Sequence, residues 1–251
     1  MTGDRDACRG LTLMELLVAV TILAVLAAMS FPVFRQVRAA SSKVIAVNTL
    51  NQCRVAGMMY QDDNNGDFWP YRKLTPGLGV QWWFGLETTV TNAEGTRVLD
   101  MRQGTLGQYF GESTRLKTDP AFAQYGAALK PKFTSGAFGF GYNVLLGGGW
   151  MGMGTVRNRE SITNASQLVI FATSAQVNTF QAPASSANPM IEEFYGFDTN
   201  TANKTVHFRL GEKALVVFAD GRLDLVPMDA STQDLRMPQA RIGSLGAQYL
   251  Q

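Results

Sequence analysis

The feature that most constrains this chain is a junction near its start, where a short polar leader meets a long apolar run. The sequence reads Arg-Gly-Leu-Thr-Leu-Met-Glu-Leu-Leu over residues 9–17, and the 19 residues 16–34 contain no charged side chain. A run of this length is enough for a helix that crosses a bilayer, which takes about 20 apolar residues. Glu15 stands at the edge of the run, where a carboxylate costs free energy unless it has a partner.

The order of residues at this junction resembles the N-terminal signal of type IV pilins and of the pseudopilins of type II secretion. On that resemblance Gly10 precedes the cleavage site of a prepilin peptidase, and Leu11 becomes the N-methylated first residue of the mature chain. Glu15 matches the glutamate that the family keeps at the fifth mature position. Pro32 matches a helix-kinking proline 22 residues into the mature chain, whereas Leu11 replaces the usual phenylalanine.

Two other interpretations of the N-terminus stay open. An ordinary secretory signal has a basic leader and a small-residue cleavage site after its apolar core. The leader here carries two acids and two arginines, and Ala24, Ala27 and Ala28 could supply such a site. A plain membrane anchor without filament assembly is the second interpretation. Because more positive charges follow the span than precede it, an orientation with the leader inside rests on the resemblance and not on charge counting.

The composition is that of a chain that folds around one globular domain. It has 251 residues, of which 46% are hydrophobic and 17% are charged. The net charge of +2 comes with no cluster of Lys and Arg, so we predict no nucleic-acid partner. Cys8 lies in the leader, which leaves Cys53 as the single cysteine of the mature chain. We expect Cys53 to be buried, since free cysteine packs as a small hydrophobic side chain.

A long helix is predicted from about residue 12 to residue 60, with a bend near Pro32. In its second half, apolar and small residues recur at steps of three and four, which indicates a face that packs on the globular domain. That face comprises Val37, Ala40, Val44, Val47, Asn51, Val55 and Met58.

The helix should end in the acidic turn at residues 62–67, because Asn and Gly can adopt the left-handed cap conformation there. The same acids do not match an EF-hand calcium loop. Counted from Asp62, the sixth position is Asp67 where the loop needs glycine, and the twelfth is Lys73 where it needs glutamate.

For residues 70–132 we predict an irregular segment with at most a short helix or two. It contains many glycines and one aromatic group, Trp82, Trp83 and Phe84. We expect these rings in the core, because aromatic side chains dominate buried area. An exposed platform that binds sugars or a partner is the alternative.

The second half of the chain is predicted to be rich in β-strands, at residues 138–146, 168–173 and 205–210. The clearest element is a hairpin in which Asp220 and Gly221 join residues 214–219 to residues 222–226. A two-residue turn of this type needs positive φ at both positions. We expect the first strand to be covered on both faces and the second to keep one face toward solvent.

This half of the chain resembles a large group of bacterial pilin-like proteins with long globular domains. In that group a histidine, a spacer and Phe-Ala-Asp-Gly precede the last strand, as His207 and residues 218–221 do here with a longer spacer. Residues 139–143 resemble the group's aromatic-Gly-Tyr-Asn segment. Residues 116–120 resemble its Cys-Pro-Ser-Asp turn with the cysteine lost.

The sequence predicts no enzyme, no catalytic residue and no metal or cofactor site. His207 is the only histidine, which excludes a metal site built on several imidazoles. A lone histidine in a strand is more often a hydrogen-bonded structural residue than a catalyst. No Gly-x-Ser-x-Gly, nucleotide-binding loop or Cys-x-x-Cys occurs. Glu160, Glu192 and Glu193 cannot be placed as an acid pair from sequence.

These observations predict an α+β protein in which a long N-terminal helix packs on an antiparallel β-sheet domain of pilin-like fold. The expected parts are a leader at residues 1–10, a transmembrane or filament-core helix at 11–34, its amphipathic continuation at 35–62 and a β-rich globular domain at 63–251.

The resemblance implies a structural subunit of a type IV pilus or of a pseudopilus-like filament of type II secretion. Gly10 and Leu11 would serve processing, and Leu11, Glu15 and Pro32 would serve assembly. The expected partners are the prepilin peptidase and other subunits, in the inner membrane before assembly and in a periplasmic or cell-surface filament afterwards. The alternatives are a membrane-anchored or filament-tip module that binds glycans or secreted proteins, and an exported enzyme with a conventional signal.

Overall fold

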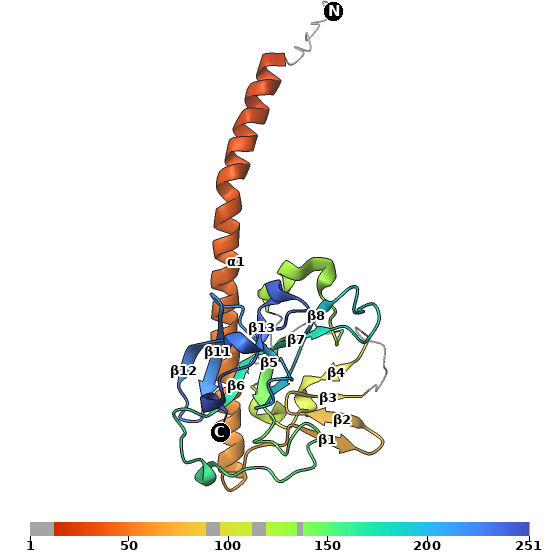
Figure 1. The fold of residues 1–251 in the computed structure, drawn as a ribbon, viewed down its shortest axis with the longest axis vertical. Helices are drawn as coiled ribbons and strands as arrows, with labels where there is room; N and C mark the ends of the chain where they lie inside the picture. Colours follow the sequence, from red (N-terminus) through yellow and green to blue (C-terminus); the bar gives the residue numbers. More distant parts are fainter. Residues whose placement is uncertain (1–12, 89–95, 112–118, 135–137, 251) are drawn as a thin grey trace, which may run out of the picture. The chain divides into compact units, whose positions relative to one another are not determined.

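The computed structural model describes residues 13–88, 96–111, 119–134 and 138–250, without the side chains of residues 31–36, 38 and 39. The chain forms two compact units, Met1–Ala40 and Ser41–Gln251. One helix, α1 (Leu13–Asp63), belongs partly to each unit (Figure 1). Pro32 lies within α1, but its side chain is outside the described residues, so the bend expected there stays a prediction.

In the first unit, the described residues form the apolar beginning of α1. All side chains over Leu13–Ser30 are exposed, and this segment has a mean hydropathy of 2.3. By length and composition it is able to cross a membrane. A helix that is apolar on every side needs an apolar environment from outside its own chain.

In the second unit, residues 41–63 of α1 pack on the globular domain through a face that differs from the predicted one. Val44, Asn51, Val55 and Met58 are exposed, whereas Val47 is half-buried and packs against the core. The other two residues of the predicted face, Val37 and Ala40, belong to the first unit. The buried face instead comprises Ser42, Ala46, Thr49, Leu50, Cys53, Ala56 and Gly57. Its mostly small side chains let the helix approach the domain closely, and Cys53 is buried as predicted.

The acidic turn ends α1 as predicted. Asn65 and Gly66 adopt left-handed backbone angles, with φ of 54° and 84°. The Gly66 N–H donates to the carbonyl oxygen of Gln61 at 2.7 Å, which satisfies one of the last carbonyls of the helix.

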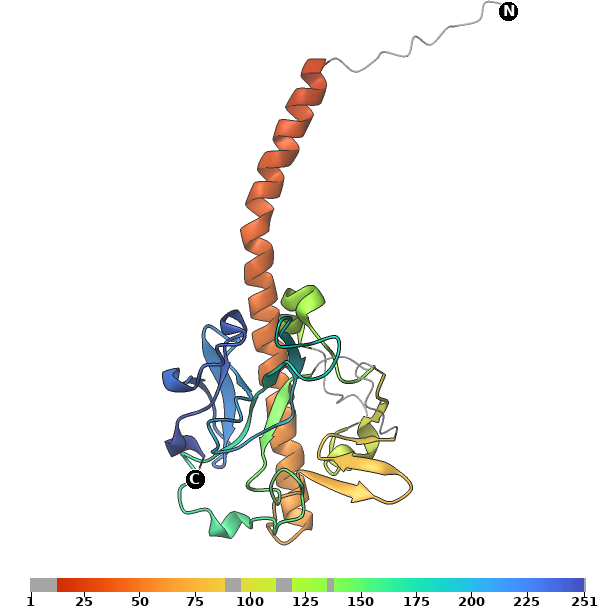
Figure 2. The same ribbon diagram turned by 45° about the vertical axis from the view of Figure 1, so that its right-hand side comes forward.

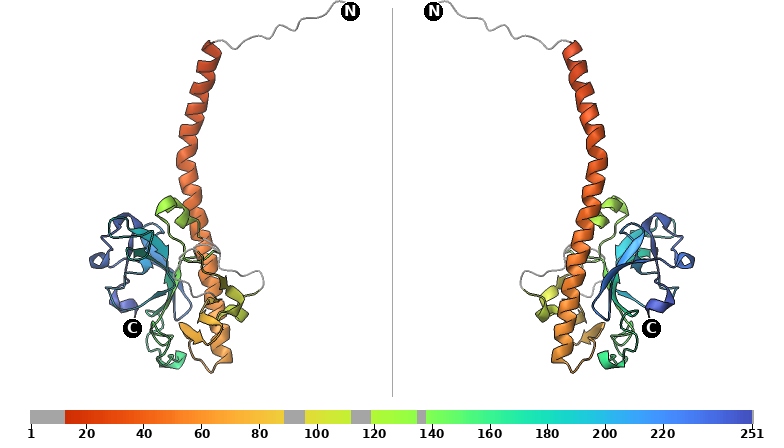
Figure 3. Two further views of the ribbon diagram at one scale, coloured as in Figure 1. Left: turned by 90° about the vertical axis from the view of Figure 1, so that its right-hand side faces the viewer. Right: turned by 90° about the vertical axis from the view of Figure 1, so that its left-hand side faces the viewer.

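A five-stranded sheet forms the centre of the second unit, in the order β12-β11-β6-β5-β9 (Figure 2). Its strands are β5 (Phe140–Asn143), β6 (Val169–Thr173), β9 (Gly196–Phe197), β11 (Lys213–Phe218) and β12 (Leu223–Pro227). Every pairing in it is antiparallel except that of β5 with β9. Figure 3 shows residues 41–63 of α1 running beside this sheet. The α+β class predicted from the sequence is therefore confirmed.

The prediction of an irregular middle segment is wrong, because a four-stranded antiparallel sheet forms there in the order β1-β2-β3-β4. Its strands are β1 (Arg72–Thr75), β2 (Gly79–Trp82), β3 (Gly85–Glu87) and β4 (Leu99–Asp100). Strands of two to four residues are too short to show an alternating pattern in the sequence.

Two small antiparallel pairs complete the strands of the described residues. They are β7 (Ala175–Asn178) with β8 (Met190–Glu193), and β10 (Val206–His207) with β13 (Ile242–Gly243). The connections contain short 3₁₀ helices: η1 (Met101–Gln103), η2 (Gly107–Tyr109), η3 (Pro120–Ala128), η4 (Arg159–Ser161), η5 (Ala230–Thr232), η6 (Pro238–Ala240) and η7 (Ala247–Tyr249). Of the strands predicted at 138–146 and 205–210, only the shorter β5 and β10 form.

The predicted hairpin is confirmed, but its turn has a different geometry. The Gly221 N–H donates to the Phe218 carbonyl at 2.9 Å, and Gly221 has a φ of 87°. Asp220 does not have positive φ. This is a turn followed by one left-handed glycine, a common form of the longer hairpin loop. As predicted, β11 is buried on both faces beyond Lys213, and Asp224 on β12 faces solvent.

An aromatic stack lies between α1 and the central sheet. The Trp69 ring stacks on Tyr142 and Phe171, with centroids 4.8 and 5.5 Å away. Trp83 and Phe84 are completely buried, and Trp82 is half-buried and packs against the core, which confirms the prediction that this aromatic group belongs to the core. Gly57 lets α1 approach the stack, since a Cβ there would lie 2.5 Å from Cη2 of Trp69.

We predict that Gly57→Val lowers the free energy of unfolding by about 1–3 kcal/mol, because the stacked Trp69 ring cannot move aside. The measurement is urea unfolding of the full-length chain in detergent micelles, followed by tryptophan fluorescence. Asn48→Val on the exposed face of the same helix is the control, with an expected change within about 0.5 kcal/mol. Equal unfolding midpoints for the two variants would contradict the close approach.

Candidate functional site

The N-terminal residues predicted to act in processing and assembly are only partly described. Glu15 lies exposed in the first turn of α1, where a carboxylate interacts favourably with the helix dipole. Gly10 and Leu11 lie outside the described residues, and Pro32 is described without its side chain. The structure therefore does not test the roles of these four residues.

A buried ion pair lies where α1 meets the globular domain. The Asp119 carboxylate caps η3 by accepting from the Ala121 N–H at 2.9 Å. Its Oδ1 also accepts from the Ser42 hydroxyl of α1 at 2.7 Å. Its Oδ2 accepts from Nε of Arg209 at 2.8 Å and lies 2.8 Å from Nη2 of the same guanidinium. Both charged side chains have zero exposure, so each charge depends on the other.

The Arg209 guanidinium extends this contact into the domain. Nη2 donates to the Gly139 carbonyl at 3.0 Å, and the planar group lies over Phe122 and Phe140 at 5.2 and 5.4 Å from the ring centroids. Nη1 lies 3.2 Å from Nδ1 of His207. A guanidinium can only donate, so Nδ1 accepts and the His207 proton is assigned to Nε2.

His207 is a structural residue in this network. Burial and the nearby Arg209 charge hold the pKa of His207 well below its usual value, so the ring stays neutral. Its Nε2 lies 3.1 Å from the Tyr125 hydroxyl. With zero exposure, the ring has no access to a substrate. The structure thus brings His207, Asp119 and residues 139–143 together, three of the segments that carry the second resemblance.

Sequence reasoning did not identify Ser42 and Arg209 as members of the network. A signal for Arg209 was present, because a cation two residues from His207 in an otherwise apolar segment needs a buried carboxylate. Nothing local marked Ser42, which lies 77 residues from Asp119 in the chain.

A second buried polar cluster surrounds Glu192 on β8. Its Oε2 accepts from the side-chain amides of Gln176 at 2.6 Å and Asn178 at 2.9 Å. Its Oε1 lies 3.5 Å from Nζ of Lys130 and 3.8 Å from Nζ of Lys132. Burial raises the pKa of Glu192, but Lys132, the two amides and Lys130 outweigh it and lower the pKa overall.

The neighbouring Glu193 behaves differently. Its Oε1 accepts from the Lys132 backbone N–H at 2.7 Å and from the Tyr195 hydroxyl at 3.3 Å. Burial raises the pKa of Glu193 to about 7. Both β8 glutamates have zero exposure, whereas Glu160 is exposed on η4. These acids therefore do not form an accessible catalytic pair.

The acids of the turn after α1 contact protein groups. Asp62 pairs with Arg159 at 2.7 Å, and Asp67 accepts from the Asn158 side-chain amide at 2.8 Å. Within the described ranges, no three side chains of His, Cys, Asp or Glu are grouped so that they could hold a metal ion.

Comparison with known families identifies the N-terminal segment. Residues 5–31 match the prokaryotic N-terminal methylation motif. No curated protein and no solved structure matches the chain. A methylation motif, an apolar helix and a globular α+β domain in this order are the arrangement of a pilin-like or pseudopilin-like protein. The motif indicates a pilin-type substrate of a prepilin peptidase, and with the apolar helix it indicates a single-pass anchor before assembly.

We predict that Asp119→Ala lowers the free energy of unfolding by about 3–5 kcal/mol, because it leaves the Arg209 charge buried without a partner. Urea unfolding of the full-length chain in micelles measures the loss. Asp62→Ala removes the exposed pair with Arg159 and should cost at most about 1 kcal/mol. If both variants unfold at the same urea concentration, the buried pair does not stabilise the domain.

We further predict that the wild-type chain loses stability relative to Glu193→Gln as the pH rises from about 4.5 to above 7, by up to about 3 kcal/mol. In this window the folded state keeps the proton on Glu193, whereas the unfolded state has released it. Glu193→Gln mimics the protonated side chain and lacks this loss, while it keeps the opposite contribution of His207, whose lowered pKa makes the folded state more stable as the pH rises. Urea unfolding of the wild-type chain and of Glu193→Gln across this pH range measures the difference in stability. If the free energies of unfolding of the two chains change in parallel with pH, the assignment to Glu193 is contradicted.

Proposed function

We propose that this chain is a structural subunit of a type IV pilus or of a pseudopilus-like filament of type II secretion. The observation that carries the proposal is the methylation motif over residues 5–31, which runs into a helix that is apolar on every side. Such a helix suits two successive environments. The bilayer surrounds it first, and the helices of neighbouring subunits surround it afterwards.

In this proposal the unprocessed chain is a single-pass protein of the inner membrane with its globular domain outside the cytoplasm. The prepilin peptidase cuts after Gly10 and methylates the new N-terminus at Leu11. The subunit then moves into a periplasmic or cell-surface filament through α1. Nothing in this sequence of steps requires catalysis by the globular domain itself.

Glu15 would select the register of assembly. Its carboxylate would pair with the α-amine of Leu11 on a neighbouring subunit within the bundle of apolar helices. A buried pair of opposite charges adds little stability, but a mismatched charge in the same surroundings costs several kcal/mol. Pro32 would remove one backbone donor and loosen α1 locally, which helps its packing into a curved assembly.

We infer a minor or specialised subunit rather than a major one. The globular part after α1 contains two sheets and two smaller strand pairs, which is large for a simple major pseudopilin. The alternative of a glycan-binding module gains no support from the aromatic group at residues 82–84. Trp83 is completely buried and its indole N–H donates to the Tyr195 carbonyl, while Trp82 donates to Glu87.

We predict that Glu15→Ala is cleaved like the wild-type chain but enters filaments at least about tenfold less, because the α-amine of its neighbour loses its partner. Immunoblots of membrane and sheared surface fractions from the native host measure both steps. Glu160→Ala, an exposed glutamate of the globular domain, is the control and should assemble normally. Normal incorporation of Glu15→Ala would disprove the pairing.

A further inference from the structure

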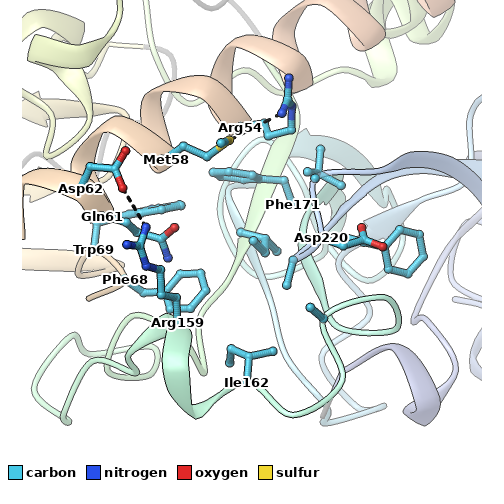
Figure 4. A pocket seen from close by; sticks show the side chains of 17 residues that line it. Arg54, Met58, Gln61, Asp62, Phe68, Trp69, Arg159, Ile162, Phe171 and Asp220 are labelled. Carbon is cyan, nitrogen blue, oxygen red and sulfur yellow. Dashed lines mark hydrogen bonds and ion pairs between the residues drawn. The ribbon is translucent and has the colours of Figure 1, made fainter. Parts of the chain in front are cut away.

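A cavity of about 250 Å³ lies between the end of α1 and the sheet, entirely within the second unit (Figure 4). The last turns of α1 form one side, and the segment around η4 forms another. Residues 218–221 lie at its rim, so the Phe-Ala-Asp-Gly motif of the sequence borders the cavity. The space is enough for a ring or a branched chain of about ten heavy atoms.

Apolar side chains form the larger part of the cavity wall, and several of them are aromatic. Phe68, Trp69 and Phe171 line it together with Ile162 and Ile170. Apolar walls with a few polar groups are typical of sites that bind small organic molecules. This composition favours a ligand with an apolar body rather than a sugar or a free inorganic ion.

Among the residues that the structure describes, one cation of the cavity lining, Arg54, has no carboxylate partner. Asp62 pairs with Arg159 at 2.7 Å, and Asp220 lies 4.0 Å from the guanidinium of Arg222. Arg54 donates to the side-chain oxygen of Asn51 at 2.9 and 3.1 Å and to Sδ of Met58 at 3.5 Å, and within the described ranges no ion pair involves it. A carboxylate on the ligand would complement this guanidinium.

A buried donor inside the cavity adds a second polar feature. Gln61 lines the wall with 8% of its surface exposed, and its Nε2 has no hydrogen-bond partner among the described residues. Figure 4 shows the Gln61 side chain beside Trp69 and Arg159. A buried amide without an acceptor is unusual in folded proteins, and an oxygen atom on a bound molecule would satisfy it.

We propose that this cavity binds a small carboxylic acid with an aromatic or branched aliphatic body. The apolar body would lie against Phe68, Phe171 and Ile170, and the carboxylate would reach Arg54 at the rim. A second oxygen would accept from Gln61. This binding site is a property of the globular domain and does not depend on filament assembly.

The test is a titration of the full-length chain in lipid nanodiscs with 3-phenylpropionate, observed through ¹³C-labelled isoleucine methyl groups. Ile162 and Ile170 should shift in a saturable way, with a Kd on the order of 0.1–1 mM for a ligand of this size. Ile45, Ile191 and Ile242 do not line the cavity and should not shift.

Three comparisons make the outcome decisive. Arg54→Met should weaken binding about tenfold or more, whereas Arg157→Met, a nearby cation outside the lining, should leave it unchanged. Ala165→Leu should fill the cavity and abolish binding, with a folded spectrum elsewhere. The neutral 3-phenylpropanol lacks the carboxylate. Its affinity for the wild-type chain should be as low as the affinity of 3-phenylpropionate for Arg54→Met. No saturable shift, equal binding of the alcohol or no effect of Arg54→Met would overturn the proposal.

Discussion

The buried pair of Asp119 and Arg209 is the interaction on which the globular unit depends. It joins the Ser42 hydroxyl of α1, the cap of η3 and the carbonyl of Gly139 through charges that have no exposure to solvent. A buried pair is weak as a source of stability, but it is demanding in geometry, because every neighbouring group must satisfy one of its hydrogen bonds. We infer that the pair specifies how residues 41–63 of α1 pack on the domain, while the aromatic stack belongs to the apolar core that this part of the helix covers.

The two parts of α1 differ in which side chains they bury. Residues 13–30 expose apolar side chains on every side, whereas residues 41–63 bury a narrow face of small residues against their own domain. The first segment can therefore exchange lipid for neighbouring helices without disturbing the second. This division agrees with the proposed function, in which the apolar segment leaves the membrane and enters a filament while the globular domain stays folded. The methylation motif, which covers the whole of this first segment, supports the same proposal.

Local signals in the sequence predicted local structure well. The long apolar run, the acidic turn and the Asp-Gly hairpin each depend on residues close together in the chain, and each forms. The prediction of the packing face of α1 was wrong, because periodicity shows that the helix has an apolar face but not which face the domain covers. Trp69 packs on the face that contains Gly57. Strands β1–β4 were missed because they are too short to alternate visibly. The network of His207, Arg209, Asp119 and Ser42 joins segments far apart in sequence, so only their spatial arrangement reveals it.

The mature N-terminus tests the central claim most directly. Mass spectrometry of the protein from membrane and sheared surface fractions of the native host reads it without altering any residue. The account predicts a chain that begins at N-methylated Leu11 and is present in the sheared fraction. A chain that begins near Ser30, or an intact Met1 with no filament form, would contradict a filament subunit and would favour the exported enzyme or the anchored module.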